Sequence, residues 1–255
     1  MAAQSSCARV VLLGASNLAI GLNAAASAAR ARLGAPLETF AACGCGRSYG
    51  QVSRFLGRVL PGIDACGLWR ALDAAPAGPT YALVTDVGND LGFGASAAQV
   101  QGWLEVSLDR LAAHGARAVI TGLPLANVER ISPAAFRFWA KLLFPWHSIE
   151  RGRLLEQARE LEARLEKLAV ERGLAKVDPQ LEWYGRDPIH VRSSRRADAW
   201  RCYVSPWNGA ENAAPRARTK FDGWPWYEQV RLFGWECGTA QPCARFEGES
   251  SLRLF

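Results

Sequence analysis

The sequence predicts a three-layer α/β/α domain on a parallel five-stranded sheet, followed by a tryptophan-rich C-terminal extension. Short apolar runs alternate with longer segments of helical periodicity. Glycine or polar residues close nearly every apolar run. The 255 residues are 49% hydrophobic, which is enough for one sizeable core. Alternating strands and helices require crossover connections, and these make the sheet parallel with helices on both faces.

Five apolar runs are the predicted strands. The first, 9–13, is apolar from its second residue on, as expected of a strand buried on both faces, and Gly14 ends it. The others are 37–42, 81–85, 118–121 and 174–177. Carboxyl ends of parallel strands meet at one edge of a sheet, and ligands bind outside that edge. Polar residues that follow these strands are therefore the first candidates for a functional site.

Three longer segments are the predicted helices. Residues 17–33 are rich in alanine and stop at Gly34. Residues 95–114 carry an apolar face of one tryptophan and three leucines. Residues 148–172 combine a leucine stripe with alternating acidic and basic side chains, as expected of a helix with one wet face.

Charge and cysteine content narrow the functional classes. The net charge of +6 comes from arginines spread along the chain, so no nucleic-acid partner is predicted. Polar residues and glycines interrupt the apolar stretch 10–29, which argues against a membrane span, and no basic segment precedes it as in a secretory signal. The seven cysteines lack the spacing of zinc knuckles, so no metal site is predicted. Without a secretory signal, we expect a cytoplasmic location in which the thiols are free.

Ser16 stands at the turn between the first strand and the first helix. Taken alone, a serine there is most often a helix N-cap. A dinucleotide-binding loop does not fit, because only Gly14 and Gly21 are available for a Gly-x-Gly-x-x-Gly pattern. The Gly-x-Ser-x-Gly elbow of α/β-hydrolases is broken by Leu18.

Asp187 and His190 follow the fifth strand in an Asp-Pro-Ile-His segment. Their i, i+3 spacing brings carboxylate and imidazole close enough to touch if the segment forms a helical turn. A carboxylate on one ring nitrogen leaves the other nitrogen free to take a proton. The simpler interpretation is a capped turn with a surface histidine.

Two further strand ends carry candidate hydrogen-bond donors. Asn89, in Gly-Asn-Asp after the third strand, has a neutral amide that can face a developing oxyanion, although the same residues also favour a plain turn. Gly46, in the glycine-rich loop after the second strand, can bring a bare backbone N–H to the same edge. Gly44 is the alternative in that loop.

In this order, Ser16, Gly46, Asn89, Asp187 and His190 resemble the blocks of the SGNH hydrolases, also called the GDSL esterase/lipase family. The resemblance spans residues 9 to 192 and implies a flavodoxin-like domain there. It favours Gly46 over Gly44, because Arg47-Ser48 follows it as in the family pattern. One departure is Ala15, which replaces the family's aspartate before the nucleophile.

The resemblance implies a serine esterase that hydrolyses an acyl or acetyl ester, with a Ser-His-Asp triad and an oxyanion hole made by Ser16, Gly46 and Asn89. No cofactor or metal is implied. The expected partner is a small-molecule, carbohydrate or lipid ester. The alternative is a non-catalytic protein of the same fold that binds or scaffolds through its aromatic tail.

Two regions leave the function open. The aromatic segment 133–146 follows the fourth strand and can line an acyl pocket, act as a lid, pack in the core or form an oligomer contact. The extension 193–255 contains five tryptophans and a basic stretch at 192–220. We expect it to pack on the domain at 1–192 or on a partner subunit, with carbohydrate stacking as the alternative. Its last residues, 245–255, predict a hairpin.

Overall fold

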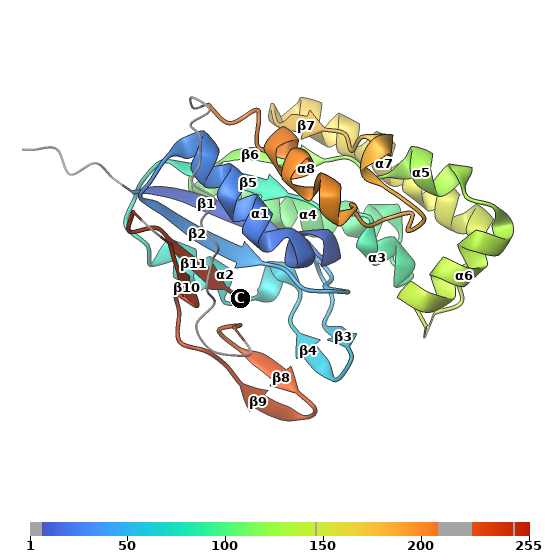
Figure 1. The fold of residues 1–255 in the computed structure, drawn as a ribbon, viewed down its shortest axis with the longest axis horizontal. Coiled ribbons are helices and arrows are strands. Elements are labelled where there is room, and N and C mark those ends of the chain that lie inside the picture. The colour runs from blue at the N-terminus through green and yellow to red at the C-terminus, as the bar shows by residue number, and fades with distance from the viewer. Residues whose placement is uncertain (1–6, 146, 209–225, 247) are drawn as a thin grey trace, which may run out of the picture.

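The computed structural model describes residues 7–145, 147–208, 226–246 and 248–255, and it has the predicted three-layer α/β/α architecture (Figure 1). Within these residues, seven strands form the central sheet in the order β10-β11-β2-β1-β5-β6-β7. They are β1 (Ala8–Leu13), β2 (Leu37–Ala42), β5 (Thr80–Val84), β6 (Arg117–Thr121), β7 (Ala175–Val177), β10 (Ala244–Arg245) and β11 (Ser251–Leu254).

The predicted five-stranded parallel sheet forms the core of this larger sheet. Strand β1 pairs in parallel with β2 and β5, and β5, β6 and β7 continue in parallel. The C-terminal residues add two strands that the five-stranded prediction lacked. Strand β11 lies parallel to β2, and β10 closes an antiparallel hairpin with β11. The predicted number of strands in the central sheet was therefore too low, because the hairpin predicted at 245–255 joins the edge of this sheet.

Successive residues of β1 point into two different cores. Val10 and Leu12 contact one apolar cluster, whereas Val11 and Leu13 contact the other. Helices α1 (Ser16–Leu33) and α8 (Arg196–Tyr203) cover the first cluster and lie side by side in Figure 1. Helices α2 (Leu68–Asp73), α4 (Ala97–Ala113) and α7 (Arg151–Arg172) cover the second.

The predicted helices agree with α1, α4 and α7 to within three residues at each end. Ser96 begins α4 with a full capping box to Gln99, and Gly173 ends α7 in the left-handed conformation with φ 62°. Five shorter helices were not among those predicted: α2 and α8 above, and α3 (Asn89–Gly92), α5 (Leu125–Arg130) and α6 (Pro133–Leu143). In Figure 1, α5 and α6 lie at one end of the molecule, beyond the sheet.

A second, four-stranded sheet was not predicted from the sequence. Its antiparallel order is β3-β4-β8-β9, formed by β3 (Ser53–Phe55), β4 (Arg58–Leu60), β8 (Val230–Leu232) and β9 (Trp235–Cys237). Each strand is only three residues long, so alternation of apolar and polar residues could not reveal it. This sheet joins the loop after β2 to the C-terminal region.

The described part of the C-terminal region is attached to the rest of the chain at several points. Trp200 of α8 lies directly over Gly21 of α1, where a methyl group would come within 2.4 Å of the indole nitrogen. Arg32 donates hydrogen bonds to the carbonyl oxygens of Ser205 and Trp207, both at 2.6 Å. Trp207 is buried, whereas Trp235 is 79% exposed. Trp224 and the basic residues 216–220 lie outside the described residues.

The boundary between a domain at 1–192 and an extension at 193–255 stays a prediction. Strand β11 is seated between β10 and β2, and the buried Arg47 guanidinium hydrogen-bonds to the carbonyl oxygen of Phe255. The Phe255 ring stacks on Phe40 at a centroid distance of 6.3 Å. Among the described residues, no helix is both long and apolar enough to cross a membrane.

Candidate active site

Three side chains from distant parts of the chain form a hydrogen-bonded line at the carboxyl edge of the sheet. Nε2 of His190 lies 2.8 Å from Oγ of Ser16, and Nδ1 of His190 lies 2.7 Å from Oδ2 of Asp187. The serine and histidine are 174 residues apart in sequence. The imidazole thus lies between a hydroxyl and a carboxylate, which is the order in which a serine nucleophile is activated.

Asp187 is held by its own turn as well as by the imidazole. Its Oδ1 accepts the backbone N–H groups of Ile189 and His190 at 3.0 and 3.1 Å. Burial by itself would raise the pKa of this carboxyl. The hydrogen bond and charge of His190, together with the two backbone N–H groups, outweigh burial and lower the pKa below its ordinary value. Asp187 is therefore ionised throughout the neutral range.

The hydroxyl of Ser16 is not used to cap helix α1. The helix begins at Ser16 itself, and Asp86 from the end of β5 takes the capping role instead. Its Oδ2 accepts the backbone N–H groups of Ala15 and Leu18 at 2.9 and 3.0 Å. A carboxylate at a helix N-terminus also complements the helix dipole. Asp86 adopts φ 59°, a left-handed conformation that aspartate tolerates better than most residues.

Asn17 joins the serine turn to the histidine loop. Its Nδ2 donates to Oδ1 of Asp86 and to the carbonyl oxygen of Ile189, both at 2.9 Å. Its Oδ1 accepts the backbone N–H of Val191 at 2.8 Å. One amide side chain therefore fixes the end of β5, the start of α1 and the segment that carries His190.

Asn17 and Asp86 were not singled out as site residues from the sequence. Asn17 occupies the position after the serine, and Asp86 is the first polar residue after Thr85 at the end of β5. Both positions were visible as polar strand ends, but nothing in the sequence showed that the two would pair. That pairing depends on the parallel register of β1 and β5, in which Leu13 lies opposite Val84.

Asn89 lies against the loop that follows β2. Its Nδ2 donates to the carbonyl oxygen of Arg47 at 2.9 Å, so its amide is next to the residue that follows Gly46. Gly46 has φ 68°, a conformation that glycine adopts readily. Gly44 is buried, and its Cβ position is enclosed by Leu60, whereas Gly46 is partly exposed. Of the two glycines, the structure leaves Gly46 the more exposed, and its role as a donor stays a prediction.

The loop after β2 is fixed by Tyr49. The buried Tyr49 hydroxyl donates to the carbonyl oxygen of Thr85 at 2.7 Å, and the Tyr49 N–H donates to Oδ2 of Asp90 at 3.0 Å. Burial raises the pKa of Asp90 to about 6, although Ser48 and the Tyr49 N–H oppose that rise. Among the described residues, no donor partners Oδ1 of Asp90.

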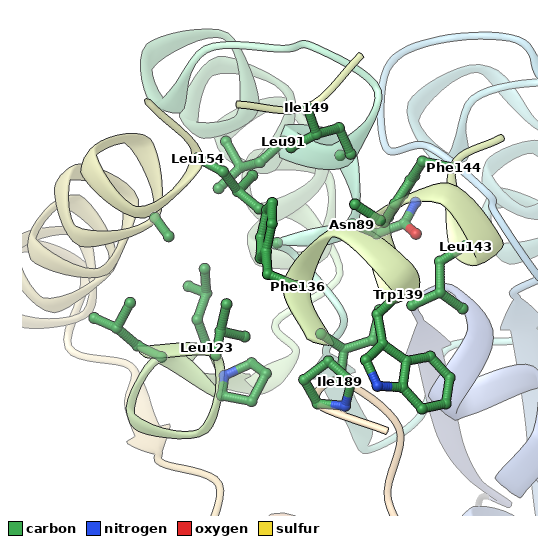
Figure 2. A pocket seen from close by; sticks show the side chains of 18 of the residues that line it. Asn89, Leu91, Leu123, Phe136, Trp139, Leu143, Phe144, Ile149, Leu154 and Ile189 are labelled. Atoms are coloured by element: carbon green, nitrogen blue, oxygen red, sulfur yellow. The ribbon is translucent and has the colours of Figure 1, made fainter. Parts of the chain in front are cut away.

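An apolar cavity opens from this site. Ser16, Asn17, Asp86 and Asn89 line one part of it, and the remainder is lined by aliphatic and aromatic side chains of α5, α6, α7 and their flanking loops (Figure 2). It encloses about 910 Å³, open solvent at its mouth included.

The other histidines lie outside the line formed by Ser16, His190 and Asp187. His114 is paired with Asp73 at 2.9 Å at the end of α4, and the exposed His147 lies near the ring of Phe93. Within the part of the chain that the structure describes, no three His, Cys, Asp or Glu side chains are grouped so that they could hold a metal ion.

Comparison with solved structures identifies the fold. The chain is similar to an inhibitor-bound aryl esterase of M. smegmatis, with 14% identity, a TM-score of 0.52, and coverage of 78% of this chain and 97% of that chain. It is also similar to a carbohydrate acetylesterase family member from Sinorhizobium meliloti, with 17% identity, a TM-score of 0.51, and coverage of 78% and 96%. No family model and no curated protein matches the sequence.

These likenesses establish the fold and agree with the architecture expected from the sequence. The chain has the SGNH hydrolase fold, with a mostly parallel central sheet flanked by helices on both faces. The predicted fold class is thereby confirmed, apart from the number of strands. At identities below 20%, the activities of the two esterases remain statements about those proteins.

Proposed function

We propose that this protein is a serine esterase that hydrolyses a carboxylic ester through Ser16, His190 and Asp187. One observation carries the proposal: Nε2 of His190 lies 2.8 Å from Oγ of Ser16 while its Nδ1 lies 2.7 Å from Asp187. These distances are within the reach required for a nucleophile and its general base. The likeness to two solved esterases is consistent with this function but does not carry it.

The reaction begins with attack of Ser16 Oγ on the ester carbonyl carbon while Nε2 of His190 accepts the hydroxyl proton. The ionised Asp187 stabilises the resulting imidazolium. Collapse of the tetrahedral intermediate breaks the bond to the leaving alcohol, which takes the proton back from His190. Water then repeats both steps on the acyl-serine, so that carboxylic acid is released and Ser16 is restored.

Asn89 and Gly46 are proposed to stabilise the oxyanion together with the backbone N–H of Ser16. An asparagine amide has two N–H donors. One of them is engaged by the carbonyl oxygen of Arg47, which fixes the orientation of the side chain. The second can then face the oxyanion without reorganisation at the moment of reaction. The N–H of Ser16 lies in the first turn of an 18-residue helix, where the helix dipole favours negative charge.

The test is hydrolysis of p-nitrophenyl esters by the wild-type protein, by Ser16→Ala, and by Ser194→Ala as a matched control. Ser194 is exposed and lies on a short helical turn next to α8. We expect Ser16→Ala to lose about 10⁴-fold or more in kcat and Ser194→Ala to keep wild-type activity. Equal activity of Ser16→Ala and wild type would refute the serine mechanism. A folded but inactive wild type would instead favour the alternative, a non-catalytic binding protein of this fold.

Cytoplasmic location, the absence of a nucleic-acid partner and a possible homo-oligomer stay predictions from the sequence. The exposure of Trp235 does not by itself favour carbohydrate binding over a contact with a partner subunit.

A further inference from the structure

The apolar cavity indicates what kind of ester the site accepts. Its polar lining is confined to the end that holds Ser16, Asn17, Asp86 and Asn89. Beyond that end, Trp139 is the only lining residue among those described with a polar side-chain atom. Burial of a polar group without a hydrogen-bond partner is unfavourable in free energy. A sugar ring or phosphate is therefore poorly matched to the deep part of this cavity, whereas a hydrocarbon chain is well matched.

Helix α6 forms one wall of the cavity. Phe136, Trp139 and Leu143 line the cavity, and Phe144 just after the helix joins them. In Figure 2, these side chains and those of Leu91, Leu123, Ile149 and Leu154 are arranged around a common space, with the Asn89 amide at its side.

The opposite face of α6 is exposed. Phe138 and Leu142 are 61% and 58% exposed, and both point away from the cavity. The aromatic segment is therefore divided, because only the side chains on one face of α6 can contact a ligand held in the cavity.

The position of His190 decides which part of the ester enters the cavity. The leaving alcohol must come within reach of Nε2 of His190, because it takes its proton from that atom. Ser16 and Asn89 line the cavity, as do Pro188 and Ile189 of the turn that carries His190, whereas His190 and Asp187 themselves are not among the lining residues. The group that stays on Ser16 as the acyl-serine is thus the one directed into the cavity.

We infer that the cavity binds the hydrocarbon chain of the acyl group and that the substrate is an ester of a medium- or long-chain carboxylic acid. This inference rests on the proposed esterase function. Each buried methylene contributes enough to raise kcat/KM about fourfold. From butyrate to octanoate we therefore expect a rise on the order of 100-fold, as long as the added methylenes remain inside the cavity.

The decisive experiment compares two identical substitutions on α6. Ala140 lines the cavity, whereas Ala134 is exposed near the start of the helix. Ala140→Phe fills part of the cavity, so that two or more methylenes of an octanoyl chain no longer fit inside it. We therefore expect the octanoate-to-acetate ratio of kcat/KM to fall at least about tenfold. Ala134→Phe should keep the wild-type ratio. An unchanged ratio in a folded Ala140→Phe, or a wild type that prefers acetate, would overturn the inference.

A second pair of variants covers the case in which Ala140→Phe does not fold. Leu143→Ala enlarges the cavity, and Leu142→Ala removes the same side chain from the exposed face. We expect Leu143→Ala to move the chain-length optimum to longer acyl groups and Leu142→Ala to leave it in place. Identical profiles for the two variants would contradict the assignment of the cavity.

A binding experiment separates failure of this inference from failure of the proposed function. Calorimetric titration of Ser16→Ala with 1-octanol and 1-butanol tests the cavity without any chemistry. Tighter binding of 1-octanol that is lost in Ser16→Ala/Ala140→Phe supports an alkyl-binding cavity even if the wild type hydrolyses no ester. Equal binding of the two alcohols overturns the inference, even if short esters are hydrolysed.

Discussion

The two sides of Ser16 are built on different physical principles. On one side, Asp86, Asn17, Asp187 and His190 form directional hydrogen bonds of 2.7 to 3.1 Å. On the other side, the cavity is bounded by apolar side chains that impose shape and size but little direction. Under the proposed function, the contrast teaches that separate sets of residues would control the position of the reacting atoms and the choice of substrate. Substitutions on the polar side should change kcat, and those on the apolar side should change selectivity.

Outside Ser16, His190 and Asp187, the largest effect is expected at Asn89. Asn89→Ala removes one oxyanion donor and should reduce kcat by about 10²–10³-fold, because a donor aimed at developing charge acts mainly in the transition state. The chain-length profile of p-nitrophenyl esters should keep its shape. Measurement of kcat and of that profile checks both expectations. An unchanged kcat would exclude Asn89 from the mechanism, and an altered profile would show that the two sides are not separate.

On the polar side of Ser16, Oδ1 of the buried Asp90 has no hydrogen-bond donor among the described residues. Its pKa is raised to about 6, so the folded state binds a proton more tightly than the unfolded state does. This tighter proton binding stabilises the folded state by about 3 kcal/mol, and the full contribution is present below about pH 4. It is lost as the pH rises through 6.

We expect Asp90→Asn to remove this pH dependence, so that its Tm relative to wild type rises between pH 5 and pH 7. Thermal unfolding of both proteins across that range measures the difference. Parallel Tm curves would show that the buried carboxyl has an ordinary pKa. Glu156→Gln serves as a control, because Glu156 is exposed on α7.

A smaller effect is expected at Asp86. Asp86→Asn keeps a side chain that tolerates a positive φ, but it replaces one acceptor oxygen with a donor and removes the charge at the start of α1. We expect kcat to fall about tenfold with little change in KM, since Asp86 acts by positioning Ser16. A rise in KM without a change in kcat would place Asp86 on the substrate side of the site instead.

Much of this organisation could be predicted from the sequence, and the exceptions have physical causes. The runs around Val10, Phe40 and Leu83 are long and apolar, so hydrophobic pattern alone located three neighbouring strands. Ser16, Asn89 and His190 were selected as candidates because polar residues at the ends of parallel strands converge. Their catalytic roles remain the proposal made above.

The remaining features depend on contacts that no local pattern encodes. The small second sheet is made of three-residue strands that stabilise one another across distant segments. The capping of α1 by Asp86 crosses 68 to 71 residues of sequence. The exposed face of α6 carries Arg137 and Lys141 but also Phe138 and Leu142, so the sequence does not show which apolar side chains of the helix line the cavity.

Strand β11 has a consequence for how the protein is made on the ribosome. It pairs with β2 across more than 200 residues, and Ser250 beside it hydrogen-bonds to Leu37 across 213. During translation, more than 200 further residues must therefore be synthesised after β2 before the strand that covers its outer edge is available. An uncovered edge strand can pair with other chains. Slowed synthesis should thus prolong an aggregation-prone stage, and the loop that carries Gly46 should be secured late.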